Sequence, residues 1–414
     1  MVVLNVFPDV GMADECVQIT ATGLKPLQPV TIRLTLQDDK GEFFQSRAFY
    51  KANARGEVNL ERDSAVGGTY CGVEPMGLIW SLKPLKPFKR PVKTAIKDSP
   101  FRYTIDLFDS LQIGVTADSQ PTITKKFERW FMSLETQKIT IKDGRIRGTL
   151  FIPSGKGPFP GVIDMYGGAG GLVEYRASLL ANHGFVVLAL AFFAYDDLPR
   201  SFHKLDLEYF EDAAELLLSN PKVAGPKVGV LGVSKGAEIA LMMSSFLPQI
   251  GATVSINGTC NLYGSTFYYK GKPILKGTNY NQEKMMITEE GLMCTTGLYD
   301  ENSDSCIPVE NASGQILFVA GEADQYYNST YFAEKAMARM KKYLKTNGRL
   351  MSMPGAGHLI EPPGFPFCWA SDLRGNRLPV LWGGEMFPHC LAQDFIWKEC
   401  RSFLLKHLNQ ASKL

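Results

Sequence analysis

The stretch VGVLGVSKGAEIALMMSSF, residues 228–246, combines a strand, a tight turn and a helix. VGVLGV is a continuous apolar run typical of a buried strand, and KGAEIALMMSSF has the apolar spacing of a helix. The turn between them is Gly232-Val233-Ser234-Lys235-Gly236, a G-x-S-x-G motif. Such a bend needs glycines where a Cβ would clash, and it exposes the serine hydroxyl at the carboxyl end of the sheet. A serine that only caps the helix is the alternative, but the matching flanks favour a nucleophile.

Residues on both sides of this stretch continue the alternation of strands and helices. Apolar runs separated by segments of helical periodicity are typical of a parallel sheet that helices cover on both faces. Together with the serine bend, this pattern predicts an α/β-hydrolase fold with a doubly wound, mostly parallel sheet. The predicted strands are residues 160–166, 184–191, 227–233, 252–256, 315–320 and 350–353, and the predicted helices are residues 173–182, 205–219, 235–246, 331–344 and 391–408.

The first third of the chain has a different pattern. Residues 30–36, VTIRLTL, alternate apolar and polar side chains, as strands with one wet face do. A length of 414 residues also favours more than one domain. We therefore expect an N-terminal β-sandwich domain at residues 1–135 and an α/β-hydrolase catalytic domain at residues 136–414. Residues 258–311 form a long aromatic and Gly-rich segment that breaks the alternation, which predicts an insertion covering a pocket.

A serine hydroxyl needs a base oriented by a carboxylate, and in this fold the acid and then the histidine follow the serine. His358 follows a strand-like run in the flexible loop PGAGH, so it is the predicted base, with His389 as the fallback. The strand at residues 315–320 leads into GEAD, which carries two carboxylates. Asp324 is the predicted acid and Glu322 the runner-up, although an aspartate here could also cap a helix.

An oxyanion hole needs two backbone N–H groups aimed at the developing negative charge. One is expected from Lys235, directly after the serine. The other is expected from Gly167 or Gly168 in the run DMYGGAGG, because glycines let the backbone approach a ligand closely. The chain contains no G-x-G-x-x-G or G-K-[ST] motif, so a nucleotide-phosphate site is not expected.

Composition excludes several other classes of function. The formal net charge of +2 provides no reason to expect nucleic acid or an anionic membrane as a partner. The eight cysteines are scattered without metal spacing, so we expect neither a metal site nor a disulfide framework, and no cofactor. The longest apolar run, residues 184–194, is about half of a membrane span, and the N-terminus has no leader pattern. No membrane span is expected.

With these residues placed, the chain resembles the family that unites acyl-CoA thioesterases with bile acid-CoA:amino acid N-acyltransferase. The segments that carry the resemblance are GLIWSLKP at 77–84, DMYGGAGGLVEYRASLLANHGFVVLALAFFAYDDLP at 164–199 and LGVSKGAEIALMMSSFLP at 231–248. The resemblance covers nearly the whole chain and implies an acyl-CoA substrate. It also implies a Ser or Cys nucleophile with Asp and His after later strands, which map onto Ser234, Asp324 and His358.

Within this family the resemblance implies that the amino-acid-conjugating members carry Cys at the bend and the thioesterases carry Ser. A serine-bound oxoester can be hydrolysed by water activated through His358, whereas a cysteine-bound thioester is more reactive towards an amine. Ser234 therefore favours hydrolysis of acyl-CoA to free acid and CoA. The alternatives are an N-acyltransferase that uses Ser to conjugate glycine or taurine, a generic carboxylesterase or peptidase, and a non-catalytic acyl-CoA-binding protein.

Two further segments suggest partners. Residues 81–97, SLKPLKPFKRPVKTAIK, carry a run of positive charge that could attract CoA phosphates, although most such runs are only solvated. The last three residues, Ser412-Lys413-Leu414, match the peroxisomal address S-K-L, which an import receptor reads. The resemblance implies a family with peroxisomal members, so we expect a peroxisomal location.

Overall fold

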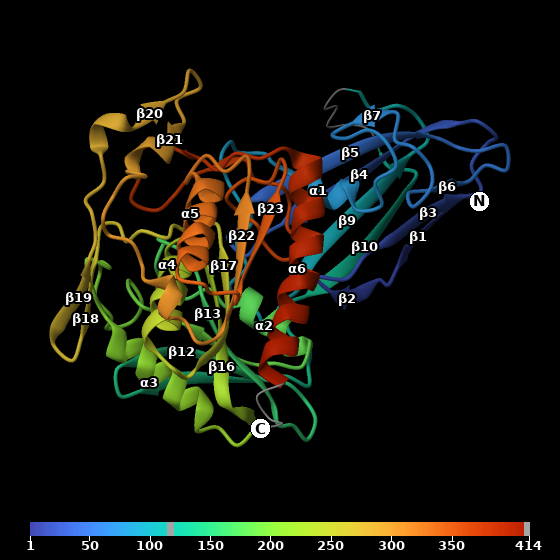
Figure 1. Cartoon of the computed structure of the whole chain (residues 1–414). Coiled ribbons are helices and arrows are strands. Elements are labelled where there is room, and N and C mark those ends of the chain that lie inside the picture. The colour runs from blue at the N-terminus through green and yellow to red at the C-terminus, as the bar shows by residue number, and fades with distance from the viewer. Residues whose placement is uncertain (114–119, 410–414) are drawn as a thin grey trace. The chain divides into compact units, whose positions relative to one another are not determined.

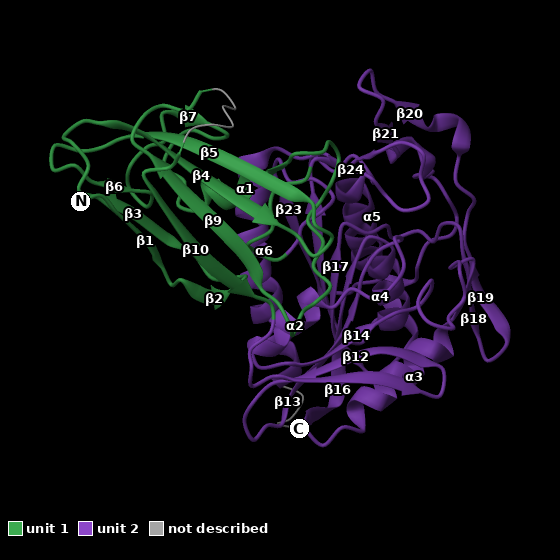
Figure 2. Cartoon of the chain, turned by 180° about the vertical axis from the view of Figure 1, so that it is seen from behind, with its two compact units in different colours: residues 1–131, 362–368 green, residues 132–361, 369–414 purple. Residues whose placement is uncertain are grey.

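The computed structural model describes residues 1–113 and 120–409, which form two compact units. The first contains residues 1–131 together with residues 362–368, and the second contains residues 132–361 and the chain from 369 onward (Figure 2). The sequence pattern did not indicate that a short segment beyond residue 360 belongs to the N-terminal unit.

The N-terminal unit is β-rich, as predicted. One sheet has the order β1-β3-β6 and the other β2-β10-β9-β4-β5-β7, with β8 paired to β5. In β4, Ile32 and Leu34 are fully buried while Arg33 between them is partly exposed, which is the alternation that the sequence predicted. The elements of this unit are β1 (Val3–Phe7), β2 (Val10–Met12), β3 (Gln18–Thr22), β4 (Pro29–Gln37), β5 (Phe43–Lys51), β6 (Val58–Asn59), β7 (Gly67–Gly68), α1 (Gly77–Trp80), β8 (Lys83–Pro84), β9 (Phe101–Phe108) and β10 (Ile123–Trp130).

The second unit is built on one sheet of order β11-β12-β14-β13-β16-β17-β22-β23 (Figure 1). From β14 onward all neighbours are parallel, whereas β11 and β12 add an antiparallel edge. This confirms the predicted α/β-hydrolase fold with a mostly parallel sheet. The strands are β11 (Gln137–Asp143), β12 (Ile146–Ile152), β13 (Phe159–Met165), β14 (Val186–Leu190), β16 (Val223–Val233), β17 (Ile250–Ile256), β22 (Gln315–Gly321) and β23 (Gly348–Met353).

Helices cover both faces of this sheet. Val228 and Val230 of β16 lie in the core that residues of α3 and α4 share. Gly229 between them faces α6, where an added Cβ would meet Leu404 at 2.9 Å. Among the described residues, no helix is both long and apolar enough to cross a membrane. The helices of this unit are α2 (Tyr175–Asn182), α3 (Leu207–Leu218), α4 (Lys235–Phe246), α5 (Ser329–Lys342) and α6 (Met386–Asn409).

The helix predicted at residues 205–219 begins two residues later than expected. Lys204–Asp206 form a short strand, β15, and α3 begins only at Leu207. Asp206 has extended backbone angles and its carboxylate accepts a hydrogen bond from the Glu208 N–H, which makes it an N-cap. The apolar periodicity continued through Leu205 because that side chain is buried in the strand as it would be in a helix.

The aromatic segment predicted as an insertion contains short strands that pair with distant parts of the chain. β18 (Thr266–Tyr269) pairs in parallel with β15 and antiparallel with β19 (Lys272–Lys276). β21 (Met293–Cys294) pairs with β20 (Met286–Ile287) and with β25 (Val380–Leu381), which pairs with β24 (Ala370–Ser371). Single turns of 3₁₀ helix lie at Gln282–Lys284, Thr296–Leu298 and Val309–Asn311. The segment therefore forms strand pairs of its own, and β18 and β21 also pair with strands outside it.

Candidate active site

Ser234 lies at the bend between β16 and α4 with φ 56° and ψ −121°, a conformation that costs energy for a residue with a Cβ. The bend is tight. A Cβ on Gly232 would lie 2.1 Å from the Gly236 carbonyl oxygen, and a Cβ on Gly236 would lie 2.3 Å from the Tyr166 carbonyl oxygen. The Ser234 N–H donates to the Ile256 carbonyl at 2.9 Å, which ties the bend to the end of β17. The two glycines of the motif are thus required by the backbone.

Asp324 and His358, which the sequence placed after two different strands, are hydrogen-bonded to each other. Asp324 Oδ2 accepts from His358 Nδ1 at 2.8 Å. The same carboxylate accepts from the N–H groups of Tyr326 and Tyr327 at 2.7 and 3.0 Å, and from the Ser329 hydroxyl. Asp324 and His358 are 6% and 2% exposed, so water is largely kept from the pair. Charge-assisted bonds of this kind hold the imidazole in one orientation.

Three aromatic rings that the sequence analysis missed enclose His358. Trp382 stacks on the imidazole with ring centroids 5.6 Å apart and 13° between planes, and Tyr326 lies on it at 4.7 Å. Tyr327 meets it edge-on at 5.2 Å. Burial raises the pKa of Tyr327 well above its ordinary value, so the phenol next to the imidazole keeps its proton. The signal available in the sequence was the pair Tyr326-Tyr327, two and three residues after Asp324.

The structure gives the alternative residues other partners. Glu322 accepts from the Ser352 hydroxyl at 2.7 Å, on the exposed surface. Both ring nitrogens of His389 bind the backbone of the His358 loop: Nδ1 accepts from the Gly357 N–H at 2.9 Å, and Nε2 donates to the Leu359 carbonyl at 2.9 Å. His389 therefore supports the loop as a neutral imidazole. That Ser234, Asp324 and His358 perform catalysis stays a prediction.

The neutral state of His389 predicts a pH-dependent contribution to stability. Burial lowers the pKa of His389 to about 4, whereas in the unfolded chain it binds a proton below about pH 6.5. Its contribution is therefore complete above pH 6.5 and is lost as the pH falls towards 4, by up to about 3 kcal/mol. We expect His389→Gln to be less stable than wild type at pH 7.5, and to lose less of its remaining stability at pH 4.5. Urea unfolding midpoints at both pH values measure this, and equal losses in the two proteins would contradict it.

Of the residues expected to form the oxyanion hole, Gly167 and Lys235 lie next to Ser234. A Cβ on Gly167 would lie 2.9 Å from the Ser234 Cβ and 3.2 Å from its Oγ, so only glycine leaves this space open. Lys235 begins α4, and an amide at a helix N-terminus has no partner within the helix. Gly168 lies in the same loop, with the Phe202 ring 4.0 Å from the position of a Cβ.

The side chain of Lys235 has a role that the motif did not reveal. Its buried ammonium donates to Glu238 at 2.6 Å, to the Tyr263 carbonyl at 2.8 Å and to the Ser265 hydroxyl at 2.9 Å. Burial raises the pKa of Glu238, and the Lys235 charge opposes that shift. The ammonium therefore links Tyr263 and Ser265, near the start of the insertion, to the first turn of α4.

Two family models match the chain. The model described as "Acyl-CoA thioester hydrolase/BAAT N-terminal region" matches residues 14–143, and "BAAT / Acyl-CoA thioester hydrolase C terminal" matches residues 205–410. Together they span well over half of the sequence. The chain belongs to the BAAT/acyl-CoA thioester hydrolase family. This confirms the resemblance inferred from the three segments.

The chain is similar over nearly its whole length to members of the BAAT/acyl-CoA thioester hydrolase family. Some of these relatives are named as N-acyltransferases and others as thioesterases. "Acyl-coenzyme A amino acid N-acyltransferase 1" of Mus musculus is 46% identical, covering 100% of both chains. "Acyl-coenzyme A thioesterase 1" of Homo sapiens is 42% identical, covering 95% of this chain and 94% of the relative. "Peroxisomal succinyl-coenzyme A thioesterase" of Mus musculus is 40% identical with the same coverage. Similarity alone therefore does not separate hydrolysis from conjugation within the family.

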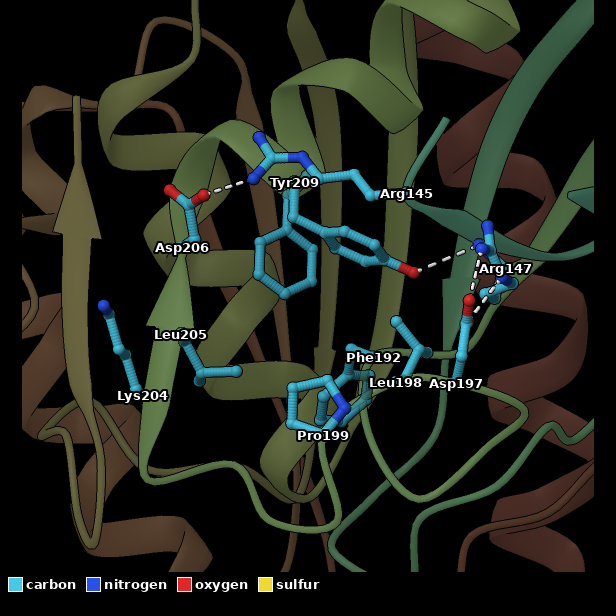
Figure 3. Close-up of a pocket in the computed structure, with 11 residues that line it drawn as sticks. Arg145, Arg147, Phe192, Asp197, Leu198, Pro199, Lys204, Leu205, Asp206 and Tyr209 are labelled. Carbon is cyan, nitrogen blue, oxygen red and sulfur yellow. Dashed lines mark hydrogen bonds and ion pairs between the residues drawn. The ribbon is translucent and has the colours of Figure 1, made fainter. Parts of the chain in front are cut away.

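A pocket of about 290 Å³ in this family member is lined by residues that follow β14, by β15 and the start of α3, and by Arg145 and Arg147 at the start of β12 (Figure 3). Its apolar lining comes from Phe192, Leu198, Leu205 and Phe210, among others. Its guanidinium groups are already paired: Arg145 with Asp206, and Arg147 with Asp197 through two bonds of 2.7 Å. Because these two charges are compensated, neither guanidinium is available to a phosphate, although the Lys204 side chain also lines the pocket.

Two lysines of the segment 81–97 form ion pairs within the N-terminal unit. The Lys93 side chain is fully buried, and its ammonium lies 2.9 Å from Asp39. Lys86 lies 3.0 Å from Glu42. Lys93 is thus unable to reach a CoA phosphate in this structure. A contact of residues 81–97 with CoA would have to come from other residues of the segment.

Proposed function

We propose that the chain is a serine thioesterase that hydrolyses fatty acyl-CoA to free acid and CoA through an acyl-enzyme intermediate. The observation that carries the proposal is a serine at a strained bend after β16, together with an Asp324–His358 pair joined by a 2.8 Å hydrogen bond. Ser234 is the nucleophile, His358 the general base and acid, and Asp324 the residue that orients the imidazole and stabilises its protonated form. Membership of an acyl-CoA family supports a CoA thioester as the substrate.

The reaction proceeds in two halves on these groups. Ser234 Oγ attacks the thioester carbonyl carbon while His358 takes the hydroxyl proton, and the tetrahedral oxyanion accepts hydrogen bonds from the N–H groups of Lys235 and of Gly167 or Gly168. The C–S bond then breaks, and the CoA thiolate takes the proton from His358. In the second half His358 removes a proton from water, which attacks the ester. The ester bond to Ser234 Oγ then breaks, His358 returns the proton to Oγ, and the free acid is released.

Conjugation of the acyl group to glycine or taurine is the second candidate. It is favoured by the 46% identity to a relative named as an amino acid N-acyltransferase. The serine argues for hydrolysis, because an oxoester on Ser234 is less reactive towards an amine than a thioester on Cys would be. Water is also present at a concentration that no amino acid reaches.

Product analysis tests hydrolysis against conjugation. The purified protein is incubated with acyl-CoA alone and with glycine or taurine added, and the products are quantified by mass spectrometry. We expect free acid as the main product in each case, at a rate that added amino acid changes by less than about twofold. A product that is mainly acyl-glycine or acyl-taurine would replace hydrolysis by conjugation. Oxoester and peptide substrates in parallel distinguish a generic esterase or peptidase.

We also propose that the protein is peroxisomal and is carried there by an import receptor that reads Ser412-Lys413-Leu414. These three residues lie outside the described part of the structure. A relative named as a peroxisomal thioesterase supports the location. A fluorescent protein fused to the N-terminus is expected to co-localise with a peroxisomal marker and to become diffuse when Leu414 is deleted. An unchanged distribution after the deletion would refute the role of the tripeptide.

A further inference from the structure

Asn257 lies at the point where the loops that carry Ser234, Asp324 and His358 meet. It directly follows β17, is fully buried, and has φ 45°, the left-handed region that Asn tolerates better than most residues. The next residue, Gly258, passes behind the serine, because a Cβ there would lie 3.5 Å from the Ser234 carbonyl oxygen. A strained, buried polar residue at this place indicates a specific requirement for its side chain.

The carboxamide of Asn257 joins the acid strand to the histidine loop. Oδ1 accepts from the Gly321 N–H at 2.7 Å, at the end of β22 and three residues before Asp324. Nδ2 donates to the carbonyl oxygens of Gly357 at 3.0 Å and of His358 at 2.8 Å. The Asn257 N–H also donates to the Val319 carbonyl at 2.9 Å, so the residue is itself fixed to β22. Both amide protons and the carbonyl oxygen of the side chain are therefore used.

Several hydrogen bonds fix the backbone around His358. Besides the two bonds from Asn257, the His358 N–H donates to the Trp382 carbonyl at 2.9 Å, and His389 binds the Gly357 N–H and the Leu359 carbonyl. Of these contacts, those of Asn257 also reach the strand that carries Asp324. Asn257 thus adds a side-chain link between the two loops to the direct backbone bond from the Ala323 N–H to the Ala356 carbonyl at 2.9 Å.

We infer that Asn257 is a positioning residue that holds Asp324 against His358 by fixing Gly321 to the peptide groups of Gly357 and His358. The inference rests on the proposed roles of Asp324 and His358. Asn257 does not touch the reacting atoms and acts only through the pair. Misplacement of a catalytic group by about 1 Å costs on the order of 10²-fold in rate, because the productive geometry is no longer held in advance.

Two substitutions test the inference. Asn257→Asp keeps the oxygen that accepts from the Gly321 N–H and tolerates positive φ. It replaces the NH₂ group, which donates to two carbonyl oxygens, by a carboxylate oxygen that is able only to accept. Asn257→Ala removes all three bonds. Asn347→Ala is the matched control, since its carboxamide also donates to two backbone carbonyls, of Ala312 and Gly314, but at the amino end of β23, away from the site. Folding is followed by circular dichroism and urea unfolding, and kcat and KM are measured on folded protein.

We expect both Asn257 variants to lose about 10²-fold in kcat with KM changed by less than about threefold, and the Asn347 control to lose stability but not kcat. In an Asp324→Asn background, Asn257→Ala is expected to cost less than about threefold further, because the contact that it maintains is already lost. A full additional 10²-fold loss there, or wild-type kcat in folded Asn257→Asp, would overturn the inference.

The rate at which a fluorophosphonate probe labels the serine separates this outcome from failure of the proposed function, because it does not depend on the acyl substrate. We expect Ser234→Ala to be unlabelled and the Asn257 variants to be labelled about 10²-fold more slowly than wild type. Labelling of Ser234→Ala at the wild-type rate would refute the proposed nucleophile. Normal labelling of both Asn257 variants with an unlabelled Ser234→Ala would refute only the role of Asn257.

Discussion

Replacing Ser234 by alanine is expected to lower kcat for acyl-CoA hydrolysis by about 10⁶-fold, the size of loss that follows removal of a serine nucleophile. Without Oγ no acyl-enzyme forms, and His358 and Asp324 have no group to activate. Removal of the hydroxyl leaves the backbone of the bend unchanged, so the variant is expected to fold. The rate of CoA thiol release, followed with a thiol reagent, measures the effect.

Ser245→Ala is the matched control for this experiment. Ser245 is buried in α4, the helix that follows Ser234, and its hydroxyl donates to the Leu241 carbonyl at 2.7 Å. It should retain wild-type kcat. If Ser234→Ala released CoA as fast as wild type, Ser234 would not be the nucleophile and the proposed mechanism would be wrong.

The second large effect is expected for Asp324→Asn, which should lower kcat by about 10⁴-fold at nearly unchanged KM. In the wild type, the carboxylate oxygen that accepts from His358 Nδ1 leaves Nε2 without a proton, as a general base requires. An amide in this place is able to present its NH₂ group to Nδ1 and so to stabilise the opposite tautomer. It also removes the negative charge that stabilises the imidazolium formed when Ser234 attacks.

Glu322→Gln distinguishes the two carboxylates of this loop. Glu322 bonds to Ser352 on the surface, so its substitution is expected to change kcat by less than about twofold. If instead Glu322→Gln lost 10³-fold or more while Asp324→Asn remained active, the runner-up identified from the sequence would be the acid. Urea unfolding of Asp324→Asn has to accompany the kinetics, because three other groups donate to this carboxylate.

Local patterns were enough to predict the fold of the second unit and the candidate residues. Strand and helix periodicity, and the glycines at 232 and 236, report backbone requirements that act within a few residues, so they are visible in the sequence. The start of α3 was missed because a short buried strand and a helix place the same apolar residue inside. Asp324 and His358 were found by their order after Ser234 and by the strands before them.

Contacts between distant segments were decided only by the tertiary structure. Asn257 bonds to Gly321 and His358, 64 and 101 residues away, and its sequence neighbourhood carries no motif for this. The same holds for His389, which the sequence offered as a base and which the fold uses to support the His358 loop. Two groups form a hydrogen bond only if the folded chain brings them within bonding distance. The residue type at one position does not reveal which distant groups come that close. The sequence by itself determined the parallel strands of the sheet and the residues that follow their carboxyl ends, but it did not predict the antiparallel strands β11 and β12. Packing determined which of those residues meet.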